Sequence, residues 1–155
     1  MMSFITGSLS SMKILIFGLP SSGKTTLAEA LAKEIPCVRF NGDKVRSICN
    51  DPILNKYADR HENIEGRLKQ ARRMFLLSED IDDSIIVVAD FVCPTKKARD
   101  IFAADFRIWM NTDKFSPYVE TKEIFENPEK SDVDVEVTDW DCLKWVNIIK
   151  SKISV

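Results

Sequence analysis

The segment Gly18–Thr26 reads GLPSSGKTT, and its residue types and spacing are suited to holding phosphate groups. Gly18, Gly23, Lys24 and Thr25 fit the pattern G-x-x-x-x-G-K-[ST], in which glycines let successive backbone N–H groups point at a nucleotide's phosphates. We expect Lys24 to bridge the β- and γ-phosphates of ATP and the Thr25 hydroxyl to ligate Mg²⁺. The residues expected to contact the ATP phosphates are Gly18, Ser21, Ser22, Gly23, Lys24, Thr25 and Thr26.

A second candidate for chemistry is the segment FNGDKVR at residues 40–46, which follows a short apolar run. Strand ends of parallel sheets face the ligand crevice, so Asp43 is placed to accept or orient the proton of an acceptor hydroxyl. Arg46 is then placed to hold an anionic group beside it. The competing interpretation is that Asp43 and Arg46 only cap a helix and form a surface ion pair.

A third candidate is Asp90, near the end of the most apolar run of the chain, SIIVVADF at residues 84–91. P-loop enzymes often place an acid at this point, where it helps to hold the waters of the metal. Asp90 is therefore a candidate Mg²⁺ residue that acts through water. Capping of the following turn is the alternative role.

The order of apolar runs predicts the scaffold that positions these residues. Short strands are expected at residues 13–17, 37–40, 84–91, 106–110 and 132–137, and the last of them should have one face exposed to solvent. Helices are expected from the glycine loop to Pro36, from residue 62 to about 78, after Pro94, and from Thr138, which forms a capping-box spacing with Asp141. Strands alternating with helices indicate a sheet covered on both faces. The expected fold class is α/β, a three-layer P-loop NTPase fold with a mostly parallel five-stranded sheet.

The composition limits the classes of partner. The 155 residues suffice for one domain, which we place at residues 12–155 after a flexible extension at residues 1–11. The net charge of −2 argues against a general nucleic-acid or membrane surface, and no apolar run reaches membrane length. The four cysteines lack a paired spacing for zinc or for a redox motif and indicate reduced thiols in a cytoplasmic protein. A guanine-reading N-K-x-D signature is missing, which argues against a switch GTPase.

Several segments, in the same order, resemble the motifs of adenylylsulfate kinases. That family reads G-x-x-x-x-G-K-T-T-L-A, D-G-D-N-V-R, D-R-x-E-N-I, I-S-P-Y-R-x-x-R-D and E-N-P-E. This chain has GLPSSGKTTLA, NGDKVR, DRHENI, VCPTKKARD and ENPE, from about Met12 to Glu129. Many families share the phosphate loop, whereas DRHENI at this distance from NGDKVR is far more specific.

The resemblance implies an ATP- and Mg²⁺-dependent kinase of sulfate assimilation. Its members phosphorylate the 3′-hydroxyl of adenosine 5′-phosphosulfate, a small nucleotide, to give 3′-phosphoadenosine 5′-phosphosulfate, and a homodimer would be expected. Carried over by position, the resemblance implies that Asp43 lies beside the acceptor ribose hydroxyl. It also implies that Arg46, Arg60 and Asn63 line the substrate pocket, roles that suit arginine forks and an amide.

The chain also departs from this family. The serine of I-S-P-Y-R, often assigned as a phosphoryl carrier, is Cys93 here, which we interpret as a packed thiol rather than a nucleophile. A basic lid, K-G-L-Y-K-K-A-R, is replaced by residues 111–125, and an aromatic residue that stacks on adenine becomes Asn55. Two alternatives therefore stay open: a related kinase acting on another hydroxyl (a nucleoside, a sugar or a nucleic-acid 5′ end), and a nucleotide-binding module without transferase activity.

Other features have structural interpretations at this stage. The charge run RLKQARRM at residues 67–74 is interpreted as a solvated helix face. The tryptophans Trp109, Trp140 and Trp145 are expected to fill the core or an interface. His61 is expected at the surface, and the polar stretch from Asn111 to Ser131 is expected to move over the site.

Overall fold

The computed structural model describes residues 12–49, 64–112 and 123–154. The strands are β1 (Lys13–Gly18), β2 (Cys37–Asn41), β3 (Ile86–Asp90), β4 (Phe106–Met110) and β5 (Val135–Val137). The helices are α2 (Lys24–Glu34), α3 (Gly42–Cys49), α5 (Ile64–Glu79), α6 (Lys96–Phe102) and α8 (Cys142–Ile153), with a 3-10 turn at Lys130–Asp132. The extension expected at residues 1–11 lies outside the described residues.

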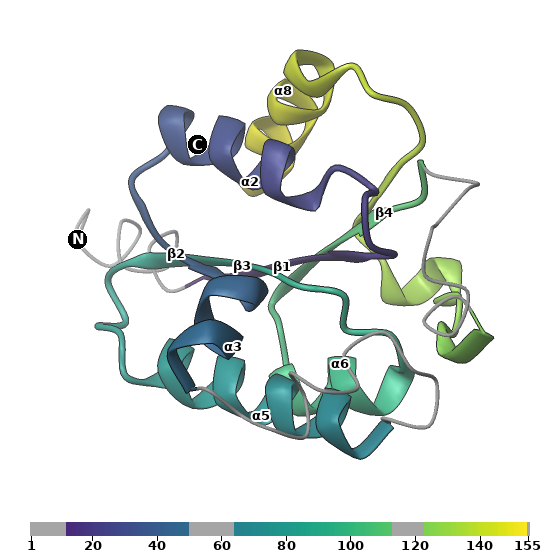
Figure 1. The fold of residues 1–155 in the computed structure, drawn as a ribbon. Coiled ribbons are helices and arrows are strands. Elements are labelled where there is room, and N and C mark those ends of the chain that lie inside the picture. The colour runs from purple at the N-terminus through teal and green to yellow at the C-terminus, as the bar shows by residue number, and fades with distance from the viewer. Residues whose placement is uncertain (1–11, 50–63, 113–122, 155) are drawn as a thin grey trace.

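The strands form one five-stranded sheet in the order β2-β3-β1-β4-β5 (Figure 1). Every pair of neighbouring strands in it is parallel. A parallel sheet is normally buried on both faces, and β3 is accordingly buried along its whole length. The predicted α/β fold class with a five-stranded parallel sheet is confirmed.

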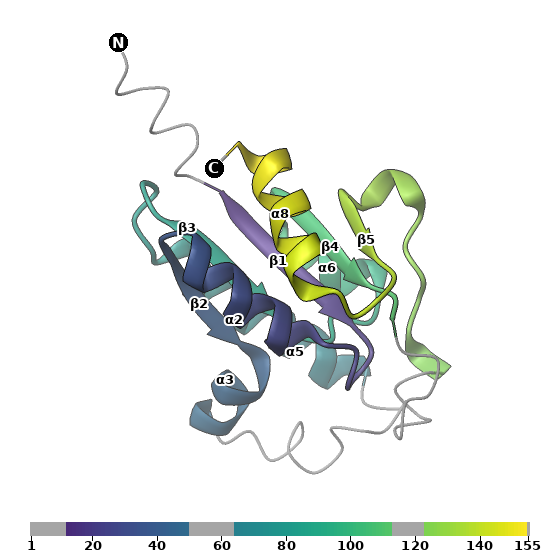
Figure 2. The ribbon, with the colours of Figure 1, turned by 90° about the horizontal axis from the view of Figure 1, so that it is seen from above.

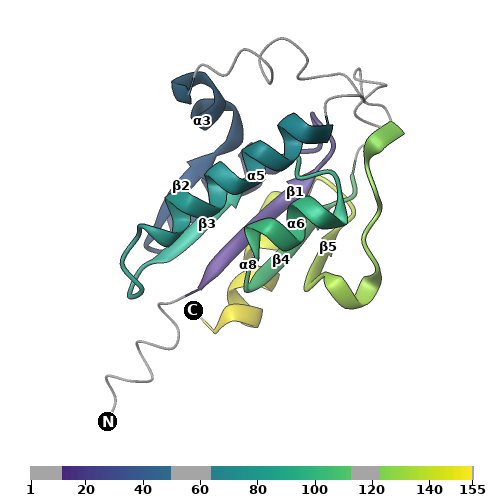
Figure 3. The same ribbon diagram turned by 90° about the horizontal axis from the view of Figure 1, so that it is seen from below.

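Helices cover the two faces of the sheet. Helices α2 and α8 lie on one face (Figure 2), and α3, α5 and α6 lie on the other (Figure 3). Side chains along β1 alternate between the two resulting cores: Ile14 and Ile16 face α2 and α8, whereas Leu15 and Phe17 face α5 and α6. This two-residue period follows from the pleat of a strand, and it anchors the loop that follows β1 between two packed layers.

Two helices differ from the sequence prediction, and the last strand is shorter than the predicted 132–137. Helix α3 was not predicted as a helix, and it follows β2 without any intervening loop. The last helix does not begin at Thr138, because the Asp141 carboxylate accepts the Lys144 amide at 3.3 Å and caps a helix that starts at Cys142. Both helix differences arise from short polar side chains that cap a helix end locally.

Parts of the prediction fall on residues that the structure does not describe. These are residues 113–122 of the stretch expected to move over the site, and the segment that carries DRHENI up to Asn63. Among the described helices, none combines the length and the apolar character needed to cross a membrane.

Candidate active site

A cavity of about 480 Å³ lies at the carboxyl ends of the central strands. One wall is the glycine loop with the start of α2, and the floor is the end of β3 with the residues after it. The opposite wall comes from α3 and α5. Ligands of open parallel sheets bind at this edge, so the cavity is the candidate site.

The phosphate loop takes its shape from glycine. Gly23 precedes α2 with φ of 97°, a left-handed conformation, and a Cβ there would lie 2.7 Å from the Trp140 ring. Ser22 is buried, and its carbonyl accepts the Thr112 hydroxyl at 2.6 Å. Of the predicted phosphate contacts, Gly18 ends β1 and is buried. Those that line the cavity are Ser21, Gly23, Lys24, Thr25 and Thr26.

The Lys24 ammonium points back at its own loop and donates to the Leu19 carbonyl at 2.8 Å. Burial lowers the pKa of Lys24 to about 8, although the negative charges of Asp43 and Asp90 act to raise it. The positive charge of Arg67 adds to the lowering. The ammonium therefore lies among two carboxylates and a guanidinium, which come from three other elements.

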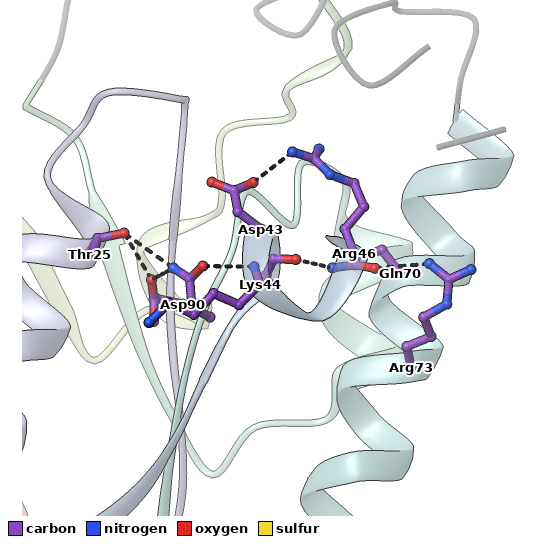
Figure 4. Close-up of polar contacts among 9 residues, drawn as sticks. Thr25, Asp43, Lys44, Arg46, Gln70, Arg73 and Asp90 are labelled. Atoms are coloured by element: carbon purple, nitrogen blue, oxygen red, sulfur yellow. Dashed lines mark hydrogen bonds and ion pairs between the residues drawn. The ribbon is translucent and has the colours of Figure 1, made fainter. Parts of the chain in front are cut away.

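Asp90 is almost fully buried at the end of β3 and accepts hydrogen bonds from three side chains. Its Oδ2 accepts the Thr25 hydroxyl at 3.2 Å and the Asn41 amide at 2.7 Å, and the Arg39 guanidinium lies 3.5 Å from Oδ1. Figure 4 shows the Asp90 and Thr25 side chains directed at one another. Burial raises the pKa of Asp90, while Asn41, Arg39 and Thr25 act to lower it.

A hydroxyl and a carboxylate 3.2 Å apart beside a phosphate loop fit Mg²⁺. This ion takes oxygen ligands, keeps several waters, and is usually bound through one or two protein groups plus substrate phosphates. Among the described residues there is no cluster of three or more His, Cys, Asp or Glu that could hold a metal alone. Thr25 and Asp90 would therefore hold the ion together with a bound nucleotide.

Helix α3 is fixed at its first turn from three sides. The side-chain Oδ1 of Asn41 accepts the Lys44 backbone amide at 3.1 Å, as an N-cap side chain does. Gly42 packs so closely on the strand end that an added Cβ would lie 2.5 Å from the Phe91 Cβ. The Gln70 amide of α5 donates to the Gly42 carbonyl at 2.8 Å. The next residue, Asp43, is thus placed by both the sheet and α5.

Asp43 and Arg46 form an ion pair at 3.0 Å (Figure 4), and both line the cavity. Their side chains are 81% and 27% exposed, respectively, so a ligand in the cavity can reach the carboxylate. The structure therefore brings Lys24, Asp43, Arg46 and Asp90 to one cavity. The other two predicted substrate residues, Arg60 and Asn63, lie outside the described residues.

Sequence reasoning missed Arg67, Gln70 and Trp140 as cavity residues. Arg67 and Gln70 are buried on α5, so the interpretation of this charge run as a solvated face was wrong for these two. Trp140 is 61% exposed and lines the cavity, so of the two roles expected for it, core or interface, the core role was wrong. The available signal was periodicity, because Arg67, Gln70, Ala71 and Met74 recur at helical spacing along one face of α5.

Cys93 lies in the floor of the cavity but is only 1% exposed, with φ of 46°. Burial raises the pKa of the Cys93 thiol far above its usual value. The reactive form of cysteine is the thiolate, so this environment disfavours nucleophilic chemistry. It agrees with the interpretation of Cys93 as a packed thiol.

Comparison with protein families gives a match to the family described as AAA domain over residues 14–141. The chain belongs to this AAA-domain family. The match begins in β1 and ends just before α8, so it includes every described wall of the cavity. The search of curated proteins returned no match.

Solved structures place this AAA-domain chain among small kinases by fold. One is the APS kinase of Mycobacterium tuberculosis in complex with AMPPNP and APS: 16% identity, TM-score 0.70, covering 94% of this chain and 99% of that one. A gluconokinase from Sinorhizobium meliloti has 15% identity and a TM-score of 0.70, covering 93% and 92% of the two chains. The shikimate kinase of Aquifex aeolicus has 14% identity and a TM-score of 0.63, covering 92% and 96%. At these identities the likeness concerns the fold, which is of the P-loop kinase type.

Proposed function

We propose that the protein is an ATP- and Mg²⁺-dependent kinase that phosphorylates a hydroxyl group of a small anionic acceptor. The observation that carries this proposal is the placement of Lys24 and Asp43 on one cavity, close enough for the carboxylate's charge to act on the ammonium. A phosphate-binding group and a solvent-accessible carboxylate on facing walls leave space between them for a γ-phosphate and a hydroxyl.

Each residue has a defined part in the proposed transfer. Lys24 and the loop amides hold the γ-phosphoryl group and offset its charge, which is the main contribution a protein makes to this reaction. Mg²⁺ held near Thr25 and Asp90 would supply further charge neutralisation at the phosphates. The acceptor oxygen bonds to the γ-phosphorus, ADP leaves with the electron pair of the broken bond, and the hydroxyl proton passes to Asp43.

Within this class we propose the 3′-hydroxyl of adenosine 5′-phosphosulfate as the acceptor. The support is the set of motifs shared with adenylylsulfate kinases, above all NGDKVR followed by DRHENI. Arg46, Arg60 and Asn63 would bind this acceptor, because arginine forks match phosphate and sulfate oxygens. A homodimer remains part of the proposal on the same resemblance, and a cytoplasmic location remains part of it on the unpaired spacing of the cysteines.

A related kinase with another acceptor is the second candidate. Similar TM-scores for an APS kinase and a gluconokinase favour keeping it, because fold alone does not separate these acceptors. A nucleotide-binding module without chemistry is the third. It would need no acidic residue on the wall facing the phosphate loop, and Asp43 lines that wall.

The test is a coupled ATPase assay with product analysis by mass spectrometry. Purified protein with MgATP is offered adenosine 5′-phosphosulfate, adenosine, sugars, sugar acids and 5′-hydroxyl oligonucleotides in parallel. Formation of 3′-phosphoadenosine 5′-phosphosulfate is the expected result. Phosphorylation of a different member of the set would correct the acceptor, and ATP binding with no phosphorylated product would reject the kinase.

A further inference from the structure

Arg67 is a buried arginine on the wall of the cavity. It lies in the second turn of α5, is 9% exposed, and lines the same cavity as Lys24 and Asp43. Removing a guanidinium from water is costly unless it meets hydrogen-bond acceptors or negative charge. Arg67 keeps a positive charge at low exposure in the lining of the cavity, where the charge is little screened by water and attracts a ligand with a negative charge.

Arg67 belongs to the wall of the cavity that is formed by α3 and α5. Gln70, one turn further along α5, donates to the Gly42 carbonyl at the start of α3 and is itself supported by Arg73, whose guanidinium lies 3.2 Å from the Gln70 Oε1 (Figure 4). The residue after Gly42 is Asp43. Arg67 therefore lies on the helix that holds the start of α3, and it lines the same cavity as Asp43.

The other charged side chains around the cavity each have contacts of their own. Asp90 lies among Thr25, Asn41 and Arg39 at the strand ends. Asp43 forms its ion pair with Arg46. Lys24 belongs to the phosphate loop, and the charge of Arg67 affects its pKa less than the charges of the two carboxylates do. Arg67 adds a second arginine to the lining of this cavity, on a different helix from Arg46.

We propose that Arg67 binds the anionic group of the acceptor, a phosphate, sulfate or carboxylate, and so selects acidic acceptors over neutral ones. This inference rests on the proposed kinase function and adds a specificity residue that no shared motif contains.

The kinetic test compares Arg67→Met, Arg67→Lys and a control, Arg72→Met, on the exposed face of the same helix. Loss of a hydrogen bond to a charged group costs about 1.5–3 kcal/mol, so KM for an anionic acceptor should rise about 10- to 100-fold in Arg67→Met. KM for MgATP should stay within about 2-fold. Arg67→Lys should recover part of the loss, because it keeps the charge but not the planar fork. Arg72→Met should match the parent protein.

The choice of acceptors separates the possible anions. Adenosine 5′-phosphosulfate, gluconate and shikimate carry a phosphosulfate or a carboxylate, and adenosine serves as the neutral comparison. The penalty in Arg67→Met should apply to whichever anionic compound the parent protein uses and should be missing with adenosine. An equal penalty for neutral and anionic acceptors would overturn the inference.

A binding test works even if no acceptor is turned over. With the phosphate loop saturated by MgAMPPNP, the melting temperature is followed against sodium sulfate and against adenosine 5′-phosphosulfate, at constant ionic strength set with sodium chloride. The parent protein and Arg72→Met should gain stability from either probe, and Arg67→Met should lose that gain. Arg67-dependent binding without turnover would reject the kinase but keep this inference. Unchanged binding in Arg67→Met, no binding by the parent protein, or a rise confined to the KM for MgATP would reject it.

Discussion

The carboxamide of Asn41 donates a 2.7 Å hydrogen bond to the carboxylate of Asp90, and these two residues are also register partners at the ends of β2 and β3. The same amide nitrogen lies 3.3 Å from the Thr25 hydroxyl, and the side-chain Oδ1 of Asn41 caps α3. One side chain therefore connects the proposed metal residues to the helix that carries Asp43. An amide suits this place because it donates and accepts at once.

Replacement of Asn41 by leucine, which has a similar volume but no hydrogen bonds, should affect both sides of the cavity. Loss of an N-cap costs about 0.5–2 kcal/mol, and Asp90 loses a donor. We expect lower stability by urea denaturation, together with reduced kcat/KM for both MgATP and the acceptor. Ser47→Ala, at an exposed position of α3, is the control. A variant with parental stability and kinetics would show that the Asn41 hydrogen bonds carry no weight.

Replacement of Asp43 by alanine tests the acceptor carboxylate. Removing general-base assistance should lower kcat by on the order of 10²-fold or more. The affinity for MgATP, measured by calorimetry, should change little, because the phosphate loop does not include this residue. Asp82→Ala, at an exposed position remote from the cavity, should behave as the parent protein does. Full turnover in Asp43→Ala alongside inactive Lys24→Met would remove Asp43 from the mechanism.

Replacement of Lys24 by methionine should abolish turnover and still stabilise the free protein. Burial lowers the pKa of this ammonium from 10.5 to about 8, which means that folding disfavours its charged form. Removing the charge should raise the free energy of unfolding of the nucleotide-free protein by on the order of 1 kcal/mol at pH 7, after allowance for solvent in the open cavity. Chemical denaturation of the nucleotide-free protein measures this gain.

The pH dependence of the stability difference between the parent protein and Lys24→Met gives a second readout. Between about pH 8 and 10.5 the unfolded chain keeps a proton on Lys24 that the folded chain has lost, so the stability attributable to this group rises with pH in this window. The extra free energy of unfolding of Lys24→Met over the parent protein should therefore decrease from pH 8 to pH 10. An advantage that stays constant across this range would contradict the lowered pKa.

Replacement of Cys93 by serine tests whether the thiol acts as a nucleophile. Burial raises its pKa and keeps it a thiol at neutral pH, so the variant should keep kcat within about 3-fold. Native protein should also resist iodoacetamide at this site while exposed Cys49 reacts, as peptide mass mapping would reveal. If the parent protein formed a phosphorylated Cys93 intermediate, and Cys93→Ser lost both this intermediate and its activity, covalent chemistry at Cys93 would be shown.

Local signals were enough to predict the phosphate side of the molecule. The apolar run of β1, the glycine spacing and the four-residue recurrence of Leu27, Leu31 and Ile35 all lie within one short segment of chain. The same holds for β3, which is too apolar to be anything but buried. Here the local preferences agree with the fold, and such agreement makes a segment predictable.

The acceptor side depends on contacts between distant segments, which sequence periodicity does not specify. Helix α3 is short and begins with a glycine. It is stabilised by Asn41 and by Gln70, which lies on α5, 28 residues after Gly42 in the sequence. The burial of Arg67 follows from how α5 is rotated against α3, and its charge alone indicated a solvated position. Trp140 was misassigned because its ring packs on Gly23, a contact between opposite ends of the chain.

Strand β2 is at the border of the sheet and has a single neighbour, β3. The loop that carries Lys24 follows the central strand β1, whereas α3, which carries Asp43, follows this edge strand. Substitutions in the outer unit formed by β2 and α3 therefore affect the pairing of only one other strand. Under the proposed function, substitutions in this outer unit would change the acceptor and leave the nucleotide-binding loop unaltered.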